Sequence, residues 1–272
     1  MIRILFSGDV CSGTGVKMCK ESVEYLKGKG HIFDFIVVNG ENAAGGLGLT
    51  YPAAKELFNV GVNAITLGNH TWSRKEILNF IEDERRIVRP ANYPLSAPGR
   101  GAVLLTEGSK SIAVINVLGV VFMEANDCPF RACDRELQEL KKHTKVVVVD
   151  MHAEATSEKT ALAYHLDGRV SAVIGTHTHV QTADERILER GTGYITDVGM
   201  TGPYDGVIGM DREAVLKKFV ERMPEKFIPA KGRSCFNGVA LEIDEETGKC
   251  IKIERIALLS GDNGEGIAEF GK

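Results

Sequence analysis

Short runs of β-branched and other apolar residues alternate with amphipathic stretches along most of the chain. Some runs are almost continuously apolar, as in Val146–Val149, which is typical of strands covered on both faces. Strands are therefore predicted at Ile2–Ser7, Phe33–Val38, Ala64–Leu67, Ile112–Val117, Lys145–Val149, Val170–Ile174 and Tyr194–Thr196. Strands that alternate with helical stretches in this way indicate an α/β fold.

Helical periodicity fills the segments between these strands. Thr50 is a candidate cap for a helix that has Pro52 in its first turn. Ser73 and Glu76 have the spacing of a capping box ahead of apolar residues 77, 78 and 81. Further helices are expected at Val16–Lys27, Cys133–His143, Ser157–Leu166 and Arg212–Arg222.

Near the C-terminus the pattern changes. Gly238–Ile243 and Cys250–Leu258 flank the polar segment Asp244–Lys249 and predict an antiparallel hairpin. The Pro- and Gly-rich segment Pro90–Gly101 predicts a long surface loop. No repeat or convincing linker interrupts the chain, so we expect residues 1–272 to form one domain with at least partly mixed sheets.

The composition is that of an ordinary globular protein. Hydrophobic residues make up 43% and charged residues 26%, and the formal net charge is −4. This balance excludes intrinsic disorder and argues against long nucleic acid as the main partner. No apolar run reaches the ~18 residues of a membrane span, and Met1–Asp9 lacks the features of a signal peptide. The six cysteines form no CxxC pair, so we expect a cytoplasmic protein without a membrane partner.

Polar side chains follow six of the predicted strands, at the ends where open α/β sheets bind ligands. These segments are Gly8–Asp9, Asn39–Asn42, Gly68–His70, Asp150–His152, Gly175–His179 and Asp197–Gly199. Taken singly, a Gly-Asp pair is a common turn and a lone histidine is a common half-buried residue. Together the segments place carboxylates, amides and imidazoles at one edge, and these groups are ligands of first-row transition metals.

The number of candidate ligands indicates two metal ions. Residues two apart in an extended segment point to one side, so His177 and His179 are expected to face one site. The candidates are Asp9, Glu41, Asn69, His152, His177 and His179. They exceed the ligands of one tetrahedral zinc, whereas two ions that share Glu41 would use them all. Two ions ~3.5–4 Å apart clamp an in-line displacement at phosphorus and provide a hydroxide nucleophile.

Several neighbouring residues have two interpretations each. His70 is expected to donate a proton to the leaving oxygen or to stabilise charge on the phosphoryl group; alternatively, it positions a ligand. Glu154 belongs either to the cap of the next helix or to the surroundings of the ligands. Trp72 and Tyr204 either stack on a nucleobase or pack at the rim of the site.

These motifs resemble the calcineurin-like metallophosphoesterases, and more specifically their YmdB-type branch of bacterial cyclic-nucleotide phosphodiesterases. The resemblance covers the chain nearly end to end. The segments that carry it are SGDV (7–10), VNGENAAGGLG (38–48), ITLGNHTW (65–72), DMHAEATSEK (150–159), GTHTHVQTADERIL (175–188) and TDVGMTGPYDGVIG (196–209).

The resemblance implies a four-layer α/β/β/α sandwich with two mixed sheets and a dinuclear centre. One ion would be bound by Asp9, Glu41, Asn42 and His179, and the other by Glu41, Asn69, His152 and His177, with His70 as the catalytic acid. The expected ions are iron or manganese, with zinc, cobalt and nickel as alternatives. The implied activity is hydrolysis of small phosphodiesters, including 2′,3′- and 3′,5′-cyclic nucleotides.

Two positions depart from the wider superfamily. Glu41 replaces the usual bridging aspartate, and Cys11 replaces a histidine. The Cys11 thiol is either a metal ligand or a buried bystander, and Asn42 is expected to complete the shell of the first ion. The YmdB-type branch resembles this chain in lacking that histidine.

Two other classes of function remain open. The same chemistry would suit phosphomonoesters or protein phosphoserine. Alternatively, the chain is a regulatory protein that binds a partner, such as RNA-processing machinery, and has an auxiliary or structural metal site. Many soluble enzymes form symmetric oligomers, but no stripe of apolar residues in the sequence predicts a homo-oligomer here.

Overall fold

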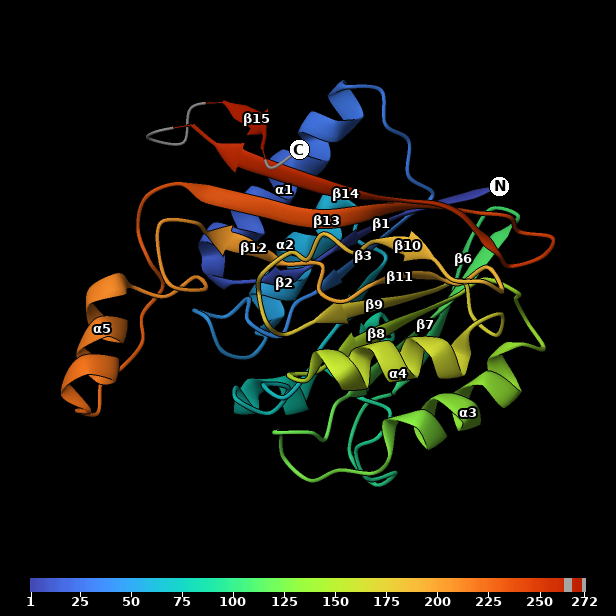
Figure 1. The fold of residues 1–272 in the computed structure, drawn as a ribbon, viewed down its shortest axis with the longest axis horizontal. Coiled ribbons are helices and arrows are strands. Elements are labelled where there is room, and N and C mark those ends of the chain that lie inside the picture. Colours follow the sequence, from blue (N-terminus) through green and yellow to red (C-terminus); the bar gives the residue numbers. More distant parts are fainter. Residues whose placement is uncertain (262–265, 271–272) are drawn as a thin grey trace.

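Two β-sheets form the centre of the computed structural model, which describes residues 1–261 and 266–270 (Figure 1). The first sheet has the order β15 (Ile267–Glu269), β14 (Cys250–Ser260), β13 (Ser234–Ile243), β1 (Ile2–Ser7), β3 (Phe35–Asn39), β4 (Ala64–Thr66) and β5 (Ile87–Val88). Two short strands, β2 (Asp9–Val10) and β12 (Met200–Pro203), pair with each other, and β12 also pairs with β13.

The second sheet has the order β10 (Arg186–Ile187), β11 (Gly193–Ile195), β9 (Ala172–Thr176), β8 (Val147–His152), β7 (Lys110–Leu118) and β6 (Ala102–Glu107). Each sheet contains parallel pairs, such as β1 with β3 and β8 with β9. Each also contains antiparallel pairs, such as β1 with β13 and β6 with β7. The predicted α/β class with two mixed sheets is confirmed, as is the C-terminal hairpin of β13 and β14.

The alternation of side chains along the strands builds the layers. In β1, Ile4 and Phe6 belong to the core between the two sheets, whereas Leu5 belongs to the core under α1 (Ser12–Gly28) and α2 (Tyr51–Val60). In β8, Val148 faces the first sheet, and its neighbours in sequence pack beneath α3 (Pro129–Leu140) and α4 (Thr156–Leu166). Both faces of each sheet are therefore buried, which explains the continuous apolar runs. Figure 1 shows the resulting four layers, as predicted.

The capping box predicted at Ser73 and Glu76 is wrong. The segment forms only a short 3₁₀ helix, Lys75–Asn79, without a side-chain cap. Ser73 Oγ instead lies 3.3 Å from His70 Nδ1, and Glu76 accepts a hydrogen bond of 3.2 Å from the backbone N–H of Tyr51. Neither side chain therefore caps the helix: Ser73 contacts the preceding His70, and Glu76 has a tertiary partner.

Other helix boundaries also differ from the predictions. The helix predicted at Val16–Lys27 begins at Ser12, and that predicted at Cys133–His143 spans Pro129–Leu140, with Pro129 in its first turn. Thr50 occupies the cap position of α2, but its side chain makes no capping hydrogen bond. These starts precede the first apolar residue of each periodic pattern, so the hydrophobic spacing did not indicate them.

The predicted surface loop Pro90–Gly101 is only partly exposed. Residues 90–93 are buried, and the Arg89 guanidinium donates hydrogen bonds of 2.8–3.2 Å to the carbonyls of Pro90, Ala97 and Pro98. A buried cation thus fixes both ends of the loop, since guanidinium donors match several carbonyl acceptors at once.

Helix α5 (Arg212–Glu221) projects from the sheets (Figure 1) and has a single buried residue, Val215. Leu216, Phe219 and Val220 on α5, and Met223 just beyond its end, are 55–76% exposed. This exposed apolar surface was not predicted from the sequence. No helix in the described part of the chain is long and apolar enough to cross a membrane.

Candidate metal centre

The predicted ligands meet at the carboxyl ends of the parallel strands of both sheets. The first sheet contributes Asp9 in β2, Glu41 and Asn42 after β3, and Asn69 after β4. The second sheet contributes His152 at the end of β8, and His177 and His179 after β9. Most residues of the strands that lead to these positions are buried and apolar, so packing of the two sheets brings the polar groups together.

His152 Nε2 is the centre of the tighter group of ligand atoms. It lies 3.0 Å from Glu41 Oε1, 3.0 Å from Asn69 Oδ1 and 3.1 Å from His177 Nδ1. Two ligand atoms that are each ~2.1 Å from one cation, at right angles, are ~3.0 Å apart. The spacing and the mixed nitrogen and oxygen donors therefore fit a single metal ion.

A second group surrounds Asp9. Its Oδ1 atom is buried and has no hydrogen-bond partner among the described residues, although it lies 3.7 Å from His179 Nε2. Asn42 Nδ2 lies 3.2 Å from His179 Nε2 and 3.3 Å from Glu41 Oε1; a half-turn of the amide would present its oxygen there. Glu41 Oε1 thus contacts both groups and is placed where a bridging ligand is needed.

Burial and mutual charge set the pKa values of the central groups. Burial disfavours the Glu41 carboxylate, but His152 outweighs it and lowers the pKa of Glu41 to about 2. Likewise, burial disfavours the His152 cation, yet Glu41 raises the pKa of His152 to about 9. Burial, followed by the charge on His152, lowers the pKa of His177 to about 3. The carboxylate therefore retains its charge and attracts one cation, which a metal ion would replace.

A network of hydrogen bonds behind His152 fixes its orientation. Thr176 Oγ1 donates a 2.7 Å hydrogen bond to Asp150 Oδ1 and therefore accepts from His152 Nδ1, which is 2.9 Å away. Nε2, which faces Glu41 and Asn69, is then the nitrogen that a metal ion would take in place of its proton. Asn39 and Thr66 donate to the other oxygen of Asp150. This network was not predicted from the sequence, although Asp150 and His152 share a face of β8.

The expectation that His177 and His179 lie in an extended segment is wrong. Their φ values are 97° and 64°, which are unusual for residues other than glycine. The backbone N–H of His177 donates a 3.1 Å hydrogen bond to Asp9 Oδ2. His179 Nδ1 lies 3.0 Å from the carbonyl of Ile208, which directs Nε2 towards Asp9. The loop thus brings one imidazole to each group of ligand atoms.

His70 is placed beside the centre in two ways. Its backbone N–H donates a 2.9 Å hydrogen bond to Glu41 Oε2, so the main chain positions the bridging candidate. Its half-buried imidazole has Nδ1 near Ser73 Oγ and Nε2 3.4 Å from Asn69 Nδ2. The side chain remains available to a substrate. The structure is therefore consistent with both roles expected from the sequence, proton donation to the substrate and positioning of a metal ligand.

Position 68 must be a glycine because the side chains of two candidate ligands, His152 and Glu41, lie too close to it for a Cβ atom. A Cβ atom at this position would lie 2.3 Å from His152 Cδ2 and 2.5 Å from Glu41 Oε2. Any side chain would therefore displace one of the two residues that form the centre.

The structure also distinguishes between the alternative roles expected for three nearby residues. Cys11 is fully buried against Met200 and Cys235, and burial raises the pKa of its thiol to about 12, as expected for a bystander. Glu154 makes no helix cap; its Oε2 atom lies 3.2 Å from His177 Nε2. Trp72 stacks on Tyr93, which supports packing at the rim.

Comparisons with known proteins agree with this architecture. A family model described as "YmdB-like protein" matches residues 5–256. A 2′,3′-cyclic-nucleotide 2′-phosphodiesterase of Bacillus subtilis is 51% identical over 257 residues, covering 94% of this chain and 97% of that protein.

Two crystal structures of other proteins are also similar to this chain. A hypothetical protein from Thermus thermophilus is 42% identical, with a TM-score of 0.89 and coverage of 95% of this chain and 99% of that one. A Mycoplasma pneumoniae protein described as a novel phosphatase is 37% identical, with a TM-score of 0.88 and coverage of 95% and 93%. The resemblance seen in the sequence is therefore confirmed, and the chain belongs to the YmdB-like family.

Proposed function

We propose that this chain is a metal-dependent phosphodiesterase that hydrolyses small phosphodiesters such as 2′,3′- or 3′,5′-cyclic nucleotides. The observation that carries the proposal is the pair of ligand groups joined by Glu41 Oε1, 3.0 Å from His152 Nε2 and 3.3 Å from Asn42 Nδ2. The name of the B. subtilis relative, a cyclic-nucleotide phosphodiesterase at 51% identity, supports the same reaction class.

The proposed centre binds two ions that share Glu41. One is held by Asp9, Glu41, Asn42 and His179, and the other by Glu41, Asn69, His152 and His177. The hydrogen bonds at His152 Nδ1 and His179 Nδ1 support this assignment, because each leaves Nε2 free to bind metal. Nitrogen and oxygen donors without a thiolate suit iron or manganese, with zinc, cobalt and nickel as alternatives.

When bound, the ions supply Lewis-acid stabilisation of the phosphoryl charge and a hydroxide nucleophile at neutral pH. The residues of the chain then perform two tasks. Glu41, oriented by the backbone N–H of His70, keeps the two groups of ligands together. The His70 imidazole donates a proton to the leaving oxygen as the phosphorus–oxygen ester bond breaks.

Metal analysis combined with two chromogenic substrates tests the proposal. We expect about two transition-metal ions per chain. Turnover of bis-p-nitrophenyl phosphate should be faster than that of the monoester p-nitrophenyl phosphate, lost on chelation, and restored by iron or manganese. Faster hydrolysis of the monoester would instead support the phosphomonoesterase. One ion or none, with no diesterase activity in any added metal, would overturn the proposal and favour the regulatory protein.

We also propose that the chain forms a homo-oligomer through α5. The exposed apolar side chains of Leu216, Phe219 and Val220 on α5, with Met223 just beyond its end, would be covered by the same surface of a second copy. Light scattering should give a dimer or larger, and Phe219→Ser should reduce the mass to that of a monomer. A monomeric wild-type protein at the same concentration would refute the interface.

A further inference from the structure

A second pocket lies at the edge of the second sheet opposite the metal centre. It is formed by the loops that precede β8, β9 and β11 together with the β13–β14 turn, whereas the candidate ligands follow β8 and β9. Six residues of β8 alone separate the two edges by roughly 17 Å at ~3.3 Å per residue. The pocket is therefore distinct from the candidate active site.

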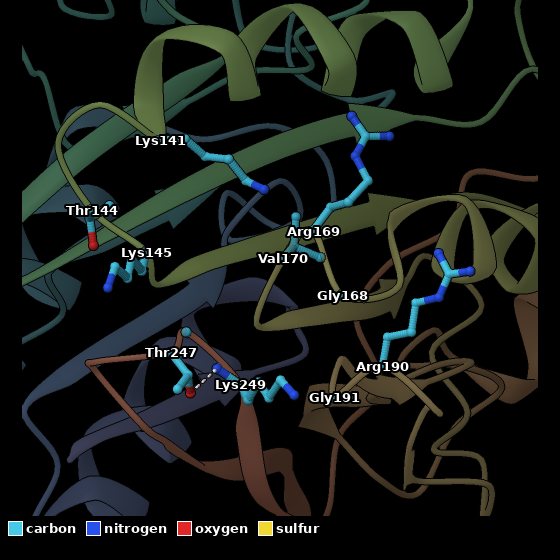
Figure 2. Close-up of a pocket in the computed structure, with 11 residues that line it drawn as sticks. Lys141, Thr144, Lys145, Gly168, Arg169, Val170, Arg190, Gly191, Thr247 and Lys249 are labelled. Carbon is cyan, nitrogen blue, oxygen red and sulfur yellow. Dashed lines mark hydrogen bonds between the residues drawn. The ribbon is translucent and has the colours of Figure 1, made fainter.

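We propose that this pocket binds a multiply charged phosphate anion, such as inorganic triphosphate or the phosphate chain of a nucleotide. Its volume is about 150 Å³, and five cationic side chains line it, with no carboxylate among the described lining residues. The cations are Lys141, Lys145, Arg169, Arg190 and Lys249. They come from the segments that precede β8, β9 and β11 and from the β13–β14 turn, and Figure 2 shows these segments around the same hollow. Such a concentration of one sign of charge is unexpected in a chain whose net charge is −4.

Two glycines that line the pocket pack against two of the cationic side chains. Gly168 has a φ of 74°, and its missing Cβ would lie 2.7 Å from Arg190 Cβ. Gly191 has a φ of 101°, and its missing Cβ would lie 2.9 Å from Lys249 Cγ. The stems of Arg190 and Lys249 thus pack directly against backbone that only glycine leaves bare. This packing restricts the two side chains where they line the pocket.

Much of the positive charge has no counterion. Arg169 pairs with Asp134 at 2.6 Å, and Lys145 Nζ donates to the carbonyl of Glu246. Lys141, Arg190 and Lys249 form no ion pair with any described residue. A ligand with several negative charges would neutralise these three cations together.

Two acidic side chains of the same loops accept local hydrogen bonds. Asp167 accepts hydrogen bonds from the backbone N–H groups of Arg190 and Thr192. Asp244 accepts from the backbone N–H of Glu246 and the hydroxyl of Thr247. Partial burial, followed by the like charge of Arg169, lowers the pKa of Lys141. An anion between these groups would relieve that repulsion, as phosphates do in basic sites.

The size of the pocket limits how much of the ligand it encloses. A volume of 150 Å³ corresponds to about five water molecules at ~30 Å³ each, which leaves space for phosphoryl groups and none for a nucleoside. A hollow that shares Lys141, Thr144 and Lys145 adjoins it and is also lined by the carboxylates of Glu245 and Glu246. Because these carboxylates would repel an anion, the phosphate chain is expected in the pocket itself.

Calorimetric titration of the full-length protein with sodium triphosphate, at about 0.15 M salt to screen weak surface attraction, tests the proposal. The double variant Arg190→Ala/Lys249→Ala should bind triphosphate at least tenfold more weakly than the wild type. The matched control, Lys20→Ala/Lys55→Ala, removes the same charge from exposed helix positions and should stay within twofold. A parallel titration with a nucleoside triphosphate identifies the source of the ligand, since tighter binding than triphosphate indicates a nucleotide and equal binding indicates a free polyphosphate.

Three results would overturn the inference. Wild-type protein that shows no saturable binding has no such site. Equal weakening in both double variants would indicate general electrostatic attraction. Binding that is lost in His152→Ala and kept in Arg190→Ala/Lys249→Ala would place the anion at the metal centre instead. None of these results depends on the catalytic activity proposed above.

Discussion

Lys159 Nζ lies 2.8 Å from Asp197 Oδ2, and both side chains are completely buried. The same carboxylate accepts hydrogen bonds from the backbone N–H and the hydroxyl of Thr178, between two candidate metal ligands. Its other oxygen accepts from the backbone N–H of Gly199. One buried ion pair thus joins α4, the His177–His179 loop and the segment that leads to β12.

Replacing Lys159 by methionine should destabilise the protein and disturb this loop. Removing one partner of a buried pair leaves an uncompensated charge, which costs about 3–5 kcal/mol. Urea denaturation measures the loss, and metal affinity reports the position of His177 and His179. The double variant Lys159→Met/Asp197→Asn should regain part of the stability. A loss below about 1 kcal/mol, the range of exposed pairs, would contradict the role of this ion pair.

The substitution Gly68→Ala should remove metal from a chain that still folds. Its Cβ would lie 2.3 Å from His152 Cδ2, a separation that forces the ligands apart. Gly13→Ala is the matched control, because a Cβ there meets no atom within 4 Å. Elemental analysis should find fewer ions in Gly68→Ala and a normal content in Gly13→Ala, with circular dichroism to confirm folding. Full metal content in both variants would refute the predicted crowding.

Thr176→Val should weaken metal binding without removing a ligand. The valine cannot accept the proton of His152 Nδ1, so the ring loses the contact that fixes its tautomer. Loss of such a supporting contact typically lowers metal affinity 10–100-fold. Competition with a chromogenic chelator measures the affinity, and Thr176→Ser should preserve it. Equal affinity in the valine and serine variants would show that the hydroxyl has no such role.

Local pattern predicted the strands and the α/β class, whereas the four layers followed from the family resemblance. Polar residues at the strand ends predicted candidate metal ligands, and the structure brings these residues together. Lys159 could not be found in this way, since lysine is almost never fully buried unless paired, and its partner Asp197 is distant in sequence. The capping box at Ser73 failed for a related reason: Glu76 contacts the backbone of Tyr51, a tertiary partner that helix spacing does not reveal, and Ser73 contacts the preceding His70.

The stability of the protein at acid pH should depend in part on Asp184. Its carboxylate accepts hydrogen bonds of 2.6 Å from the hydroxyls of both Thr182 and Thr196, and Arg186 Nη1 lies 3.3 Å away. Burial disfavours the charged form, but these hydrogen bonds outweigh it and lower the pKa of Asp184 below its ordinary value.

An acid whose pKa is lower in the folded state binds fewer protons there than in the unfolded chain. Its stabilisation is therefore complete above the unfolded pKa of ~3.9 and is lost as the pH falls through the folded value. Asp184→Asn should reduce stability at pH 7, and the difference from the wild type should shrink as the pH falls below about 4. Urea denaturation across this range measures the effect, with the exposed residue Asp83 as the control in Asp83→Asn. A difference between wild type and Asp184→Asn that stays constant with pH would show that the Asp184 carboxylate does not contribute through its charge.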